Sequence, residues 1–191
     1  MRFLTFLAVL LFSGSIFAQK PCDFSVNVTD SIGQYKVTKD YIVYEKVFAG
    51  NSSYIFNSIA ISDGLPTLNV QFIEKSSDFI KAKCLDANSK IFLQLENGKI
   101  VTLLHVAQES CGTMVRDEKG MYNRVLTGYF LFKKDDSEYL KKSPVSLMRI
   151  KFSTETVDYI IKNAIKAELN NQLYTPANYF MDYFHCINES N

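Results

Sequence analysis

The hairpin predicted around Asn97-Gly98 constrains the fold more than any other feature of the sequence. Apolar runs flank this dipeptide on both sides, within residues 90–106. Asn and Gly both tolerate the positive φ of a two-residue type I′ turn, so the pattern predicts a hairpin. The expected cross-strand partners are Leu95 with Ile100, Leu93 with Thr102 and Ile91 with Leu104. One face of this hairpin is almost wholly apolar and the other becomes apolar toward the base, so we expect both to be covered there.

The first 18 residues have the pattern of a secretory signal peptide. Arg2 precedes an apolar run over residues 3–12, and the small residues that follow are Ser13, Gly14, Ser15 and Ala18. This run is shorter than the ~20 residues that a spanning helix needs. Cleavage between Ala18 and Gln19 would leave residues 19–191, which we expect to form a single exported domain with no membrane insertion. The sequence does not distinguish a periplasmic from a secreted protein.

The charges indicate which partners the chain is poorly suited to bind. The sequence has 21 basic and 20 acidic side chains, and Arg2 is lost with the signal peptide. Nucleic acid and anionic membranes require a concentrated basic surface. A balanced chain without such a region therefore argues against both, and a secreted or envelope protein is the partner that we expect.

Alternating apolar and polar residues predict strands along most of the chain. The pattern recurs over residues 24–29, 41–48, 54–61, 68–73, 122–134 and 145–152. Links between neighbouring strands are short before residue 134, as antiparallel hairpins require. Helical spacing follows, and it predicts a short helix over 135–142 and C-terminal helices over 154–171 and 176–187. The expected fold class is α+β, an antiparallel sheet with the two C-terminal helices packed on one face.

Several of these segments together resemble a group of bacterial proteins. They are the ENG turn, the charged helix ending at Lys142-Ser143-Pro144, the MRIKF strand and the aromatic C-terminal segment. Over residues 85–187 the chain resembles small exported proteins of Bacteroidetes-type bacteria, which have no assigned activity. The Phe17-Ala18-Gln19 exit resembles their signal peptides. The resemblance further implies O-glycosylation at Ser31, in Asp30-Ser31-Ile32, although a turn there is the preferred interpretation.

Candidate catalytic and metal-binding residues are few, because the chain has only two histidines. His105 could act as a base for Cys111 beside Glu109, or it could bind metal with His185 and Cys186. Four cysteines in an exported chain instead predict disulfides. Motifs such as HExxH, GxSxG and phosphate-binding glycine loops are absent from the sequence. The sequence therefore predicts no catalytic, cofactor-binding or metal-binding residue.

The cysteine positions favour one disulfide pairing of the three that are possible. Cys84 and Cys111 lie equally far in sequence from the Asn97-Gly98 turn, so extension of the hairpin would bring them together. Cys22 and Cys186 would then pair and join the mature N-terminus to the final helix. The main rival is Cys22–Cys84 with Cys111–Cys186.

Three functions stay open at this point. The favoured one is a non-enzymatic binding or envelope-associated domain that uses a sheet edge or the aromatic final helix. The second is a hydrolase with a carboxylate or histidine site, which a polar cleft containing His105 would favour. The third is a carrier of a small apolar ligand, which an enclosed apolar cavity would favour. A carbohydrate platform made by Tyr35, Tyr41, Tyr44 and Tyr54 is also possible, but core packing is the preferred role of these rings.

Overall fold

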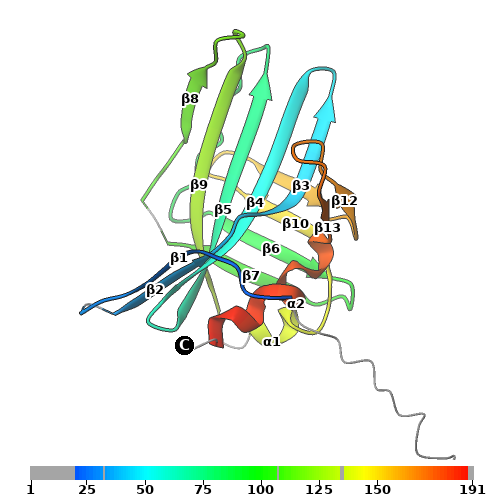
Figure 1. Ribbon diagram of the computed structural model, residues 1–191. Helices are drawn as coiled ribbons and strands as arrows, with labels where there is room; N and C mark the ends of the chain where they lie inside the picture. Colours follow the sequence, from blue (N-terminus) through cyan, green and yellow to red (C-terminus); the bar gives the residue numbers. More distant parts are fainter. Residues whose placement is uncertain (1–19, 32, 107, 134–135, 189–191) are drawn as a thin grey trace, which may run out of the picture.

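The computed structural model describes residues 20–31, 33–106, 108–133 and 136–188 (Figure 1). The predicted signal peptide and the cleavage point between Ala18 and Gln19 lie outside these ranges. Strands make up most of the described chain, and a few short helices lie in its last third. The strands are β1 (Phe24–Thr29), β2 (Gln34–Thr38), β3 (Tyr41–Phe48), β4 (Asn51–Ser62), β5 (Leu65–Ser76), β6 (Lys90–Leu95), β7 (Ile100–His105), β8 (Thr113–Arg116), β9 (Tyr122–Phe132), β10 (Val145–Lys151), β11 (Thr156–Ile160), β12 (Ile165–Lys166) and β13 (Leu173–Tyr174).

All the paired strands run antiparallel, which confirms the predicted sheet type. The order is β1-β2-β4-β5-β9-β7-β6-β10-β11. The same edge of β4 pairs with β3 over one half and with β2 over the other, and β9 divides one edge between β8 and β7. Strands β12 and β13 form a separate two-stranded sheet. The first half of the chain is therefore a series of hairpins, while β5 and β9 join segments far apart in sequence.

The large sheet curls into two layers that enclose the core. The long strands β4, β5 and β9 lie in front, and β6, β7 and β10 cross behind them (Figure 1). Ring contacts join the layers, with Phe72 of β5 against Phe152 and Tyr44 of β3 against Tyr159 of β11. Side chains from both layers are fully buried, among them Val70 of the front layer. The sheet therefore builds one continuous core.

The central hairpin forms, but its predicted register is wrong by one residue. Leu93 lies opposite Val101 and Ile91 opposite Leu103, because the turn contains three residues, 96–98. The Leu95 amide donates to the Lys99 carbonyl, at 2.9 Å between nitrogen and oxygen. A one-residue shift moves a whole set of side chains to the other face of a strand. The observed register places the buried residues of both strands on the core face.

The helix predicted over residues 154–171 is wrong, because this segment contains β11 and β12. Strand β11 pairs along β10, and its buried and exposed residues alternate. Tyr159 and Ile161 are buried, whereas Ile160 between them is 71% exposed. In the sequence, the apolar residues of this segment fit the helical period and the strand period. Pairing with the free edge of β10 selects the strand.

The final helical segment begins at Pro176, as predicted. It consists of η1 (Pro176–Asn178), α2 (Tyr179–Tyr183) and η2 (Phe184–Asn188), and a short helix α1 (Asp136–Leu140) precedes β10. Proline suits the first helical position because its missing N–H would have no helical partner there. Phe180 and Phe184 are buried and pack on Phe132 of β9. The helical segment at the C-terminal end and the antiparallel sheet confirm the α+β class.

The structure contains the favoured disulfides, Cys84–Cys111 and Cys22–Cys186. A bridge between Leu85 and Ser110 lies directly beside the first bond. The hairpin register alone would not align Cys84 with Cys111. One extra residue on the β7 side, between the hairpin and this bridge, restores the alignment.

Candidate functional site

His105 is a core residue rather than part of a polar site. Its side chain is 7% exposed and packs on the Phe130 ring. Its Nδ1–H donates to the Asp86 carbonyl oxygen at 2.9 Å. Cys111 is bonded to Cys84, so it offers no thiol. The structure therefore does not assemble the nucleophile and base that the sequence allowed for His105, Glu109 and Cys111.

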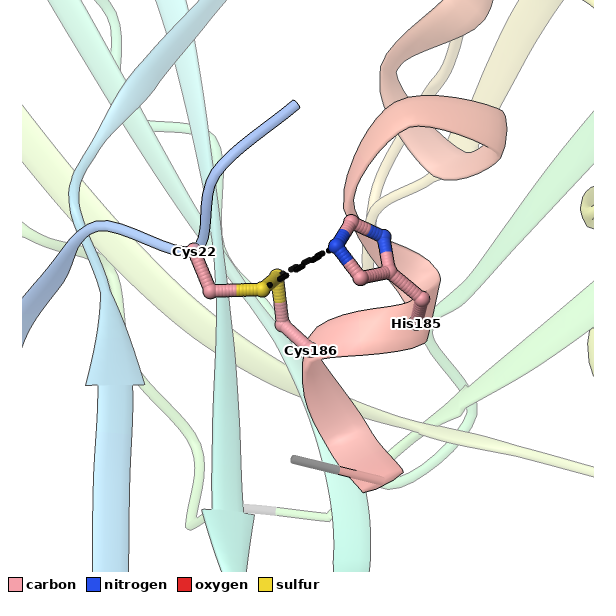
Figure 2. A group of neighbouring side chains, drawn as sticks. All are labelled: Cys22, His185 and Cys186. Atoms are coloured by element: carbon pink, nitrogen blue, oxygen red, sulfur yellow. Dashed lines mark hydrogen bonds between the residues drawn. A yellow bond between two sulfur atoms is a disulfide. The ribbon is translucent and has the colours of Figure 1, made fainter. Parts of the chain in front are cut away.

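His185 lies beside the disulfide that joins the two ends of the described chain (Figure 2). Its Nε2 atom is 3.2 Å from Cys22 Sγ and 3.9 Å from Cys186 Sγ. The metal site considered from the sequence combined His105, His185 and Cys186. In the structure, Cys22 rather than His105 lies beside His185 and Cys186. Cys186 is fully buried, whereas Cys22 and His185 are partly exposed.

The four tyrosines considered as a carbohydrate platform do not converge. Tyr35 is exposed on β2, Tyr44 packs on Tyr159 and Tyr54 packs on Phe56. Tyr41 alone among the four contacts a group of other tyrosines, which come from the C-terminal part of the chain. The predicted core role holds for Tyr41, which is 9% exposed.

A void between the layers of the sheet is too small for a carried ligand. Its volume is about 10 Å³, and Val43, Asn57 and Met148 are among the residues that line it. A volume of this size is about the minimum for one water molecule. This void gives no support to the carrier hypothesis.

A cleft of about 350 Å³ lies beside α2, and we call it the tyrosine cleft. It lies where the N-terminal segment, the β2–β3 turn, β13 and α2 meet. The lining residues are Lys20, Asp23, Thr38, Lys39, Asp40, Tyr41, Gln172, Leu173, Tyr174, Tyr179 and Tyr183. Its volume lies within the usual range for small-ligand sites, roughly 300–1,000 Å³.

Tyr41 organises the aromatic wall of this cleft. Its ring lies 5.0 Å from that of Tyr174 and 5.3 Å from those of Tyr179 and Tyr183, measured between centroids. Its hydroxyl accepts a 2.7 Å hydrogen bond from the Thr175 amide. The same residue thus fixes the rings and the chain entering the final helical segment. Tilted and edge-on ring pairs of this kind stabilise by about 0.5–1.5 kcal/mol beyond their buried area.

The Lys20 ammonium group sits against this wall. It forms a 2.6 Å ion pair with Asp182 and donates a 2.9 Å hydrogen bond to the Thr175 hydroxyl. It also lies 5.9 Å from the ring centroid of Tyr41 and 5.8 Å from that of Tyr183. Partial burial opposes its charge, but the Asp182 hydrogen bond and the neighbouring phenols outweigh burial, so the pKa of Lys20 is raised. Two rings, a carboxylate and a hydroxyl therefore surround one ammonium group.

Acidic groups slightly outnumber basic ones around the cleft. Asp23 and Lys39 form an exposed ion pair at 3.3 Å, and Lys20 neutralises Asp182. Asp40 has no ion-pair partner among the described residues. Burial raises the pKa of Tyr179, and the groups that act on it, including Asp40, belong to the cleft. The site is thus an aromatic cleft with one uncompensated carboxylate.

The aromatic stripe of the final segment is visible in the sequence, whereas no motif marks Lys20. The signal that could have found Lys20 was the predicted Cys22–Cys186 bond, which brings residues near Cys22 to that stripe. The opposing wall, from β13, follows the segment whose secondary structure was mispredicted.

None of the described helices is both long and apolar enough to cross a membrane. Comparisons with protein-family models, with curated proteins and with solved structures give no match to this chain.

Proposed function

We propose that the chain is an exported, non-enzymatic binding domain whose tyrosine cleft binds an amine-bearing group of a secreted or envelope protein. A lysine side chain is the simplest group of this chemistry. The observation that carries the proposal is the environment of Lys20, whose ammonium group is already held by Tyr41, Tyr183 and Asp182. Two disulfides are compatible with an exported protein, and the predicted signal peptide supports export.

The physical basis is the attraction between a cation and the negative face of an aromatic ring. Such a contact contributes about 0.5–1 kcal/mol at an exposed position and about 2 kcal/mol when water is excluded. A nearby carboxylate adds direct attraction, and Asp40 has no cation of its own among the described residues. A positively charged ligand is therefore favoured over a neutral or negative one.

A pair of small ligands tests this proposal on residues 19–191. Nα-acetyl-lysine methylamide carries the ammonium group, and its norleucine counterpart has a similar apolar stem without the charge. We expect NMR titration to show the lysine compound binding at cleft residues more tightly than the norleucine compound. Binding should weaken as salt is added, because the charges are partly exposed.

Variants identify the groups responsible. Tyr183→Leu removes one ring while keeping an apolar side chain, and we expect about two- to fivefold weaker binding, equivalent to 0.5–1 kcal/mol. Asp40→Asn should also weaken binding. The matched control is Tyr129→Leu, because Tyr129 is 41% exposed on β9 and does not line the cleft. Equal affinity for the two compounds, or no effect of Tyr183→Leu, would rule the proposal out.

A further inference from the structure

We propose that reduction of the Cys22–Cys186 disulfide converts this bond and His185 into a zinc-binding site. One donor atom from each of the three residues lies within 4.8 Å of the others. Figure 2 shows the imidazole directed at the two sulfur atoms. This inference is independent of the tyrosine cleft and does not require the proposed amine ligand.

The existing distances are close to those of a tetrahedral zinc site. Zinc bonds of about 2.3 Å to sulfur and about 2.1 Å to nitrogen place a nitrogen and a sulfur ligand roughly 3.6 Å apart. His185 Nε2 now lies 3.2 and 3.9 Å from the two sulfur atoms, on either side of that value. The two sulfur atoms are bonded to each other, so after reduction they would have to separate to roughly 3.8 Å.

The positions of the three residues allow this separation. Cys186 is fully buried in η2, which fixes its sulfur within the final segment. Cys22 precedes β1 and is partly exposed, so its side chain has the freer surroundings. Three protein ligands would leave a fourth position for water on the exposed side. Zinc would then replace the covalent bond as the link between the two ends of the described chain.

The chemistry requires a reductant, which we take to be a dithiol. The dithiol transfers two electrons and two protons to the disulfide, becomes a cyclic disulfide itself and leaves two cysteine thiols. Zn²⁺ then binds both sulfur atoms as thiolates together with the imidazole, and two protons are released. Thiolate and imidazole ligands suit zinc, whereas the oxidised pair offers no thiolate.

The second disulfide provides an internal control. Among the described residues, Cys84 and Cys111 have no third potential ligand grouped with them in this way. We therefore expect metal binding to follow the redox state of Cys22 and Cys186 alone. The Cys84→Ser/Cys111→Ser variant should retain it, because its only remaining thiols after reduction are those of the proposed site.

The test uses residues 19–191 reduced with dithiothreitol, which is then removed under argon. Co²⁺ serves as the probe, because thiolate ligation produces visible absorption bands, and Zn²⁺ should displace it at one equivalent. We expect the oxidised protein to bind neither ion. The reduced protein and the Cys84→Ser/Cys111→Ser variant should bind one ion each, and zinc should raise their melting temperatures.

Two variants test the ligands. Cys22→Ser/Cys186→Ser should abolish binding, and His185→Gln should weaken it at least tenfold while leaving both thiols in place. His185→Gln also keeps the disulfide in the oxidised state, so its fold can be verified before reduction. The proposal is overturned if reduced wild-type protein binds no more Co²⁺ than oxidised protein, or if His185→Gln binds as tightly as wild type.

Discussion

At the scale of single residues, Gly98 and Gly112 require positive φ for different reasons. Gly98 has a φ of 84° in the hairpin turn, and a Cβ there would have open space around it. Gly112 has a φ of 67°, and a Cβ there would meet the Val125 carbonyl oxygen and lie 3.0 Å from Leu126 Cα. The first glycine satisfies a backbone conformation only. The second also allows the chain after Cys111 to approach β9.

We predict that alanine has unequal effects at these positions. Gly98→Ala should lower the free energy of unfolding by about 1–2 kcal/mol, because it forces an L-residue into the left-handed region. Gly112→Ala should lower it by more, because backbone atoms of β9 must also move. Urea denaturation of the two variants measures the difference. Equal losses would show that the close approach at Gly112 contributes nothing.

The residues around the turn also show how far the sequence can be interpreted. Asn97-Gly98 was enough to predict a hairpin, but glycine at this place suits both a two-residue turn and a three-residue turn ending in a left-handed residue. Burial of Val101 and Leu103 distinguishes the two turns, because only the three-residue turn places these side chains on the core face. Local turn chemistry therefore fixed the element, and burial fixed its register.

At the scale of elements, β11 shows why a segment with two possible periods depends on its neighbour. Residues 157, 160, 161, 164 and 165 are apolar at helical spacing, and residues 157, 159 and 161 alternate as in a strand. Pairing along β10 decides between them, with Arg149 and Asp158 joined across the strands by a 2.6 Å ion pair. The start of the final helical segment was easier to predict, because Pro176 marks its first residue.

Two adjacent isoleucines of identical chemistry test the strand. Ile161→Ala should lower the free energy of unfolding by about 2–5 kcal/mol, because Ile161 is only 7% exposed. Ile160→Ala should change it by less than about 0.5 kcal/mol, because Ile160 is 71% exposed. A helical stripe over 154–171 would instead bury both side chains. Similar losses in denaturant unfolding would contradict the strand.

The tyrosine cleft could be predicted only in part, because it lies between elements. Tyr179 and Tyr183 were visible as an aromatic stripe, and Cys22 was expected near it. The position of Tyr41 against that stripe depends on the curl of the whole sheet, which no local pattern encodes. Gln172 and Leu173 of the opposing wall directly follow residues 154–171, the segment that was wrongly predicted to be helical.

At the scale of the whole molecule, the two disulfides restrict very different lengths of chain. Cys22 and Cys186 are separated by 164 residues, and Cys84 and Cys111 by 27. The longer bond joins the segment before β1 to η2. It holds together the first and last described elements, where fraying would otherwise begin.

We predict that the longer bond contributes more to stability. The chain-entropy estimate gives it an advantage of about 1.5 kcal/mol at 25 °C over the shorter bond. Cys22→Ser/Cys186→Ser should therefore unfold at a lower denaturant concentration than Cys84→Ser/Cys111→Ser. Measurement of both midpoints under oxidising conditions checks this, and the reverse order would refute it.

The pairing of β5 with β9 also determines how the chain reaches this fold. Their register runs from Thr67–Leu131 to Ser76–Tyr122, and the whole β6–β7 hairpin and β8 lie between them in sequence. Strands β3, β4 and β5 can associate early as a local meander, but the free edge of β5 stays open until β9 arrives. Sheets with such distant pairings fold in milliseconds to seconds. During that interval the β5 edge is the part of the chain most exposed to aggregation.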